Sequence, residues 1–489
     1  MRGIRLNCCA ALLLLAITPA QAGRTDWREM SVGHFHLYST LSDSNTRNVA
    51  RQLQAFENTV GELLRGEDRL PDVPTLIYIL NSHDFQQYAV DRPGLAGFFA
   101  DRPYVNLIAI DGDLPFDQVR ITVFHEYTHY IQRNSNTMQY PPWYMEGYAE
   151  LYSSFRLKDD MIELGNVPEG LRISMQDWIP LERLLAVTQD DPEYRTENLM
   201  PQFYGESWAL VHMLLFDDHA LTAATETYLD NMDSGLPEPE AFKVGFSYSK
   251  ADLDKALHDL IRKRLIHLKR VKFLKTAAID EAPVTKMTQA EADAQMARLT
   301  FAFGRPQNVV APLLAEALKS GPEDPRTRAL QARIAAHTDH PIDLAGLAAP
   351  LARGGTGDVQ QRIDVADALL RGSEAKESAT TVLAVLGDLV HAETPPLEAV
   401  ALWSEAAERS DLKPVEIIDV LMPASARAPH DTRLLATLAW ANEILGEKSK
   451  ARGYYNRIIR VSNQPAERLW AQKQADSERL QNTGTGSPH

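Results

Sequence analysis

The sequence predicts an α+β domain followed by an all-α solenoid of stacked helical hairpins. Strand-like and helix-like segments alternate in the first part of the chain, which we place at residues 24–280. In the second part, residues 285–480, only Ala- and Leu-rich helical patterns are found, and they recur at about 35 residues, a spacing typical of helical repeats. The length of 489 residues and the ordinary Gly, Pro and charge content also indicate folded domains.

The first 22 residues are expected to be a cleaved secretory signal. Two arginines precede an apolar run at residues 8–17, which is too short to span a bilayer, and residues 20–22 (Ala-Gln-Ala) offer a cleavage site. A lipoprotein signal is the alternative, but Cys8 and Cys9 open the apolar run instead of following it. We therefore expect a bacterial periplasmic or secreted protein, free of disulfides after cleavage and without stable membrane insertion.

The formal net charge is -16, which argues against nucleic acid as a partner. One segment is an exception, because residues 262–275 carry seven Lys and Arg residues among 14. A membrane-surface helix is one interpretation of this segment. A solvated connector helix is the other, and the acidic character of the whole chain favours it.

Elements of the first domain follow from hydrophobic spacing. A small mixed sheet and four helices are expected before the solenoid. The predicted strands are 34–40, 74–80 and one or two within 97–110, with a hairpin at 161–173; the predicted helices are 45–65, 116–134, one beginning after Pro141-Pro142, and 202–216.

The solenoid is expected to consist of helical hairpins that resemble tetratricopeptide units. In the segment 431–465, Gly446 marks the turn between two helices, and Ala451 and Tyr455 form a small-x3-aromatic packing pair. Candidate repeat starts near residues 290, 324, 358, 396 and 431 differ by 34, 34, 38 and 35. A protein partner on these repeats is expected, because stacked hairpins form extended binding surfaces.

The predicted helix 116–134 contains the pattern His125-Glu126-Tyr127-Thr128-His129. Residues four apart lie on one helical face, so both imidazoles can bind one zinc ion. Glu126 stands beside them, where it can accept a proton from a water that the metal activates. The motif is short, so a third ligand decides the interpretation.

Glu146 is the expected third ligand, near the start of the next helix. Two neutral histidines and one carboxylate leave a fourth position open for water, as in catalytic zinc sites. Glu150 lies one turn further on and is placed to accept the spare N–H of a zinc-binding histidine. A surface salt bridge is the alternative role of Glu150.

The pattern HExxH followed by Trp143-x-x-Glu146-Gly-x-Ala-Glu150 resembles the gluzincin metallopeptidases, in particular the peptidase MA-like family and the aminopeptidase N-type enzymes. The resemblance implies a zinc peptidase fold over roughly residues 30–260. It implies Zn²⁺ as cofactor, His125, His129 and Glu146 as ligands, Glu126 as general base and Glu150 as an acid that supports a zinc-binding histidine. It also implies that Tyr204 stabilises an oxyanion, although a buried helix aromatic is an equal alternative.

One departure from those aminopeptidases bears on the substrate. Residues 94–99 lack the acid that would hold a free amino terminus, which leaves the strand around 97–100 open to pair with a longer peptide. We therefore expect an endopeptidase acting on a peptide or protein. The alternatives are an interaction scaffold that carries an inactive zinc-binding domain, and a zinc hydrolase acting on a non-peptide amide.

Overall fold

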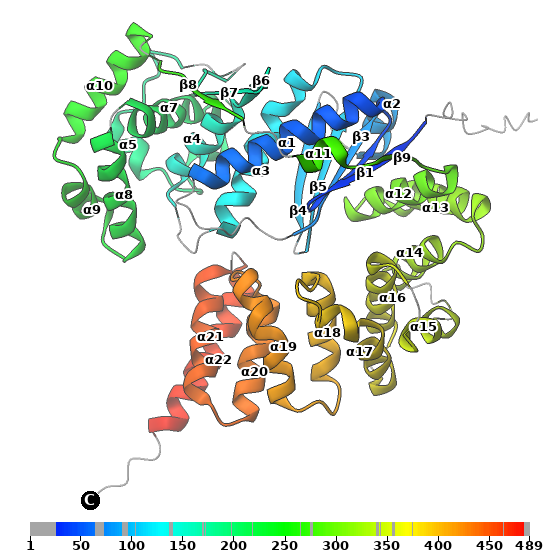
Figure 1. Ribbon diagram of the computed structural model, residues 1–489. Helices are drawn as coiled ribbons and strands as arrows, with labels where there is room; N and C mark the ends of the chain where they lie inside the picture. The colour runs from blue at the N-terminus through cyan, green and yellow to red at the C-terminus, as the bar shows by residue number, and fades with distance from the viewer. Residues whose placement is uncertain are drawn as a thin grey trace, which may run out of the picture.

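A computed structural model describes residues 26–483. It leaves out residues 64–72, 90–95, 103, 136–139, 169–170, 172, 197, 218, 265, 274–276, 339–341, 343, 355–356, 374 and 463. The expected signal segment therefore lies outside the described residues. Figure 1 shows an α+β domain above a curved array of helices.

A six-stranded mixed sheet forms the centre of the α+β domain. Strands β2, β3 and β5 are parallel, whereas β4, β1 and β9 each run antiparallel to their neighbour. Alternation along β3 gives the sheet two apolar faces, since Ile77 and Ile79 belong to one core cluster and Tyr78 and Leu80 to another. In sheet order the strands are β4 (Gly97–Arg102), β5 (Val105–Asp111), β3 (Thr75–Leu80), β2 (Phe35–Ser39), β1 (Arg28–Val32) and β9 (Val284–Lys286).

Different helices cover the two faces of this sheet. Helices α1 and α3 contribute Phe56 and Phe124, which stack with ring centroids 4.1 Å apart, to the larger core cluster. The opposite face packs against Met296 and Leu299 of α12, the first helix of the array. The helices up to the array are α1 (Asp43–Leu63), α2 (Ser82–Asp84), the π-helical turn η1 (Phe85–Ala89), α3 (Phe116–Ser135), α4 (Pro142–Ser153), α5 (Leu181–Ala186), α6 (Pro192–Arg195), α7 (Met200–His212), the π-helical turn η2 (Met213–Asp217), α8 (His219–Asp233), α9 (Glu238–Gly245), α10 (Lys250–Lys263) and α11 (Ala277–Glu281).

A second, three-stranded sheet differs from the sequence prediction. Strand β7 (Met161–Leu164) pairs with β6 (Arg156–Lys158) on one side and with β8 (Lys269–Lys272) on the other. The expected hairpin at 161–173 is therefore wrong, because its turn precedes residue 161. Both helical interpretations of 262–275 are also wrong, since α10 ends at Lys263 and the chain returns as a strand.

The second half of the chain is a stack of helical hairpins, and each predicted repeat start lies within one residue of a helix start. The first helices of the hairpins are α12 (Gln289–Ala302), α14 (Pro325–Ala336), α16 (Val359–Gly372), α18 (Leu397–Glu408) and α20 (Thr432–Ile444). The second helices are α13 (Gln307–Ser320), α15 (Ala345–Ala352), α17 (Lys376–Val390), α19 (Pro414–Arg427) and α21 (Lys448–Val461), and α22 (Pro465–Thr483) packs on the last of them.

A buried ion network joins the first helices of four successive hairpins. Asp364 is fully buried and accepts hydrogen bonds from Arg298 at 2.5 and 3.0 Å and from Arg333 at 3.1 Å. Arg333 also donates to Glu398 at 2.6 Å. These residues lie on α12, α14, α16 and α18, so the network fixes how the hairpins stack.

The array also contacts the α+β domain at the end of the β4–β5 hairpin. The Tyr104 hydroxyl donates to Asp431 Oδ1 at 3.5 Å, and the Arg433 guanidinium lies 5.7 Å from the Tyr104 ring centroid. Because Asp431 caps α20, the fifth hairpin reaches back to the sheet that the first hairpin covers. Among the described residues, no helix has the length and apolar character needed to cross a membrane.

Candidate metal centre

Helices α3 and α4 carry the expected ligands and are held together by a buried arginine. Arg120 of α3 is 1% exposed and donates to the carbonyl oxygens of Ser153 and Phe155, at 3.0 and 2.7 Å. These carbonyls lie at the end of α4, where backbone acceptors lack helical partners. At its other end, α4 begins at Pro142, whose fixed φ suits the first helical position.

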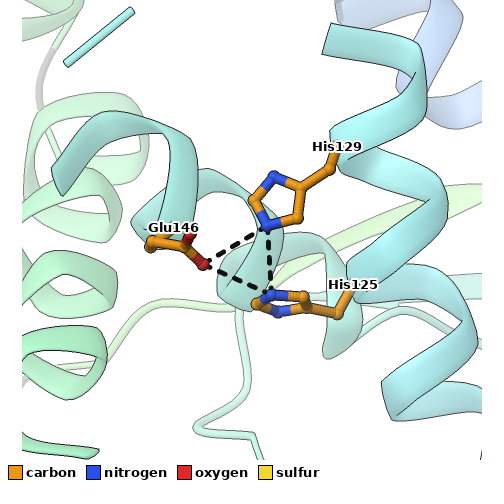
Figure 2. A group of neighbouring side chains, drawn as sticks. All are labelled: His125, His129 and Glu146. Carbon is orange, nitrogen blue, oxygen red and sulfur yellow. Dashed lines mark hydrogen bonds and ion pairs between the residues drawn. The ribbon is translucent and has the colours of Figure 1, made fainter. Parts of the chain in front are cut away.

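The two helices bring His125, His129 and Glu146 together (Figure 2). The Nε2 atoms of the two histidines are 3.2 Å apart. Glu146 Oε2 lies 3.4 Å from His125 Nε2 and 3.3 Å from His129 Nε2. The three ligand atoms therefore form a nearly equilateral triangle.

The dimensions of this triangle fit a tetrahedral zinc ion. Bonds of about 2.1 Å to nitrogen and oxygen place tetrahedral ligand atoms about 3.4 Å apart. The three separations of 3.2, 3.3 and 3.4 Å agree with that edge length. Two imidazoles and one carboxylate are also a donor set that zinc uses at catalytic sites.

Each candidate ligand has a partner that orients it. His125 Nδ1 lies 3.4 Å from Glu150 Oε1, the contact expected of that acid. His129 Nδ1 lies 3.3 Å from Gln132 Oε1, one turn along α3. The Tyr194 hydroxyl donates to Glu146 Oε1 at 2.8 Å, on the side of the carboxylate away from the histidines. Such contacts fix ligand geometry and raise metal affinity.

Two of these partners, Gln132 and Tyr194, are absent from the sequence prediction. Gln132 follows His129 by three residues, so helical spacing contains a signal for it. Tyr194 lies on the short helix α6, where Arg183 binds Glu193 at 2.7 Å and Asp191 at 2.9 Å. No periodic signal connects α6 with α4, so this contact depends on the tertiary fold.

Electrostatics at the ligands favour a cation. Burial would lower the pKa of His125, but the hydrogen bond to Glu146 and the charge of Glu150 outweigh burial and raise the pKa to about 9. Burial would raise the pKa of Glu146, but the hydrogen bonds with His125 and His129 hold it well below its usual range. The carboxylates thus attract positive charge, and zinc would compete with protons for the imidazoles.

Glu126 and Tyr204, the two expected catalytic residues, border the same site. Both side chains are partly exposed, and the Tyr204 ring stacks near His125 with centroids 6.2 Å apart. Burial and the charge of Glu146 raise the pKa of Tyr204 well above its usual value, so its hydroxyl remains a hydrogen-bond donor. Within the described part of the chain, the Glu126 carboxylate has no hydrogen-bond partner, which leaves it available to a substrate or water.

Close packing and a buried network position the ligand helices. A Cβ at Gly147 would lie 2.2 Å from the Ser207 carbonyl oxygen, so α4 can approach α7 only with glycine beside Glu146. On α3, the Tyr127 hydroxyl donates to the buried Glu57 at 2.7 Å, and Glu57 also lies 2.9 Å from His34. Tyr127 belongs to the HExxH segment, so this network holds the helix from its buried side.

Comparisons with known proteins do not support the family assignment made from the motif. No family model matches the chain, and no curated protein matches it. A solved structure that matches is that of yeast Tom70, with 10% identity, a TM-score of 0.33, and coverage of 75% of this chain and 74% of that one. A similarity at this score gives no conclusion about activity.

The prediction that the chain belongs to the gluzincin peptidases, in particular to the peptidase MA-like family, is therefore wrong. The motif that suggested it consists of a few residues whose spacing is dictated by helix geometry. Unrelated folds converge on such spacings, so the motif identifies a local arrangement and not a family.

Proposed function

We propose that this chain is an exported, zinc-dependent hydrolase that cleaves internal peptide bonds. The observation that carries the proposal is the triangle of ligand atoms from His125, His129 and Glu146, with an available carboxylate at Glu126 beside it. Zinc, when bound, supplies Lewis-acid polarisation of a carbonyl and lowers the pKa of water.

The residues around the site have three further roles: proton transfer, stabilisation of negative charge and positioning of the ligands. Glu126 accepts the proton of the attacking water and transfers it to the leaving amine, as general base and then general acid. Tyr204 remains a neutral donor and can stabilise negative charge that develops on the carbonyl oxygen. Glu150, Gln132 and Tyr194 hold the ligands in place and take no part in proton transfer.

A peptide substrate is supported by the edge strand beside the metal helix. Strand β4 stands at the edge of the described sheet, and a Cβ at Gly97 would lie 2.7 Å from Val119 of α3. Its outer backbone groups can therefore pair with an extended peptide lying next to the helix that carries His125. Small amides cannot use this pairing, whereas a peptide of several residues can.

The test of this proposal is turnover of a peptide library by the zinc-loaded chain and its Glu126→Gln variant. We expect cleavage within peptides, and a loss of about 100-fold or more in the variant, which should still bind zinc. Equal turnover by both would refute the role of Glu126. If only non-peptide amides were cleaved, the chain would be a zinc hydrolase but not a peptidase.

A second candidate function is an interaction scaffold, which the helical hairpins α12–α22 favour. Stacked hairpins bind partners along an extended surface and need no catalysis. Replacement of the gene in its native host by the Glu126→Gln variant separates the two. A scaffold would keep its full cellular function in this variant, whereas a hydrolase would lose it.

A further inference from the structure

The three-stranded sheet presents a basic face that the proposed function does not use. In the β6–β7–β8 register, Arg156 is paired with Glu163 and Glu163 with Arg270. One row further, Lys158 is paired with Met161 and Met161 with Lys272. Directly paired residues point to the same side of a sheet, and alternate residues share it. These six side chains therefore form one surface, which we call the basic face.

The basic face is exposed and carries excess positive charge. Arg156, Lys158, Arg270 and Lys272 are all exposed, and Glu163 is the single acid among the six residues. Glu163 binds Arg270 at 2.8 Å. In the described structure no ion pair is formed by the other three cations. On a chain of formal charge -16, this local excess is an unusual surface that attracts anions.

Apolar side chains lie within and next to these charges. Met161, between Lys158 and Lys272, is 38% exposed. Leu268, directly before β8, is 41% exposed. A soluble anionic partner that binds through charge alone would not require exposed apolar side chains. Cations that surround exposed apolar side chains are typical of surfaces that lie on anionic lipid.

We propose that the basic face docks on the surface of a membrane that contains anionic phospholipid. The cations would contact the headgroups, and Met161 would enter the boundary between headgroups and acyl chains. Strands β7 and β8 lie on the side of the α+β domain opposite the helical array (Figure 1). Docking would therefore leave the hairpins free on the far side. This adsorption requires no helix that crosses the bilayer.

Lysines on edge strands also prevent sheets from joining edge to edge, which is the competing explanation of this face. The experiment that separates the two is co-sedimentation of the full chain with phosphatidylcholine vesicles, with and without phosphatidylglycerol. A Lys158→Glu/Lys272→Glu variant tests the face. A Lys255→Glu/Lys473→Glu variant is the matched control, with the same change of charge at exposed residues elsewhere.

We expect binding to the phosphatidylglycerol vesicles only, lost at about 0.5 M salt, where exposed charges are screened. The Lys158→Glu/Lys272→Glu variant should bind about tenfold more weakly or worse, and the control variant should resemble the wild type. Circular dichroism spectra should show that both variants are folded. Three results would overturn the proposal: no binding by the wild type, equal binding to both vesicles, or equal binding by the two variants.

Discussion

The hydroxyl of Tyr194 donates a 2.8 Å hydrogen bond to Glu146 Oε1, while Oε2 of the same carboxylate faces the two histidines. The carboxylate is thus fixed at both oxygens, and only one of them is directed to the proposed metal. Tyr194 is 48 residues from Glu146 in sequence, and Arg183 forms ion pairs with Asp191 and Glu193, which closely precede it.

Replacing Tyr194 with Phe should weaken zinc binding by about tenfold or more, because the ligand carboxylate loses the contact that orients it. Competition with a chromophoric chelator measures this affinity. Tyr204→Phe is the matched control, since no hydrogen bond from Tyr204 to a ligand is described. It should keep zinc affinity and lower turnover. Unchanged zinc affinity in the Tyr194→Phe variant would show that the contact does not position the ligand.

Glu206 should make the protein less stable as pH rises. Its side chain is buried, and burial raises its pKa to about 7 despite hydrogen bonds from the Ile179 backbone and the Gln202 amide. Below about pH 4.5 the Glu206 carboxyl is protonated in both the folded and the unfolded chain. Above that pH the unfolded chain releases the proton, whereas the folded chain keeps it until about pH 7. Its contribution to stability is therefore lost between about pH 4.5 and 7.

The Glu206→Gln variant removes this titration while it keeps an oxygen acceptor. At pH 8 its free energy of unfolding should exceed that of the wild type by about 1–3 kcal/mol, and near pH 4.5 the two should agree closely. Urea unfolding at several pH values measures the difference. If the free energy of unfolding changed with pH in the same way for both chains over this range, the pKa of Glu206 would not be raised.

Asp364→Asn should destabilise the helical array by about 3–5 kcal/mol, because Arg298 and Arg333 lose the buried carboxylate that compensates their charge. Chemical unfolding followed by circular dichroism measures this loss. Asp388→Asn is the control. Asp388 also pairs with an arginine, Arg362, but its side chain is 72% exposed, so its loss should cost less than about 1 kcal/mol. Equal effects of the two substitutions would refute a structural role for the buried network.

Features set by neighbouring residues could be predicted from the sequence, whereas contacts between segments far apart in the chain could not. His125 and His129 lie on one face because of helix geometry, and the start of α4 after Pro141-Pro142 brings Glu146 back toward them. The repeat starts were also predictable, since each hairpin packs on its neighbours and repeats one pattern. For example, Asp431 caps the N-terminus of α20 and is itself the last predicted repeat start.

Other parts could not be predicted, because they join segments far apart in the chain. Strand β1 pairs with β9 through Arg28 and Lys286, and these strands are only five and three residues long, too short for an alternation to identify them. The segment 269–272, with three basic residues and Val271, forms a strand because β7 offers an edge, which no local pattern reveals. Tyr194 reaches Glu146 only in the folded chain. The short metal motif, in turn, suggested a family that the comparisons do not support.

Zinc binding by His125, His129 and Glu146 is the property on which the proposed chemistry depends. Elemental analysis of the purified chain, after reconstitution with zinc and removal of excess metal, tests it most directly, with His125→Ala as the control. We expect close to one zinc per chain in the wild type and none in the control. A wild-type chain without zinc, or a His125→Ala chain that retains it, would show that these residues do not form the metal site.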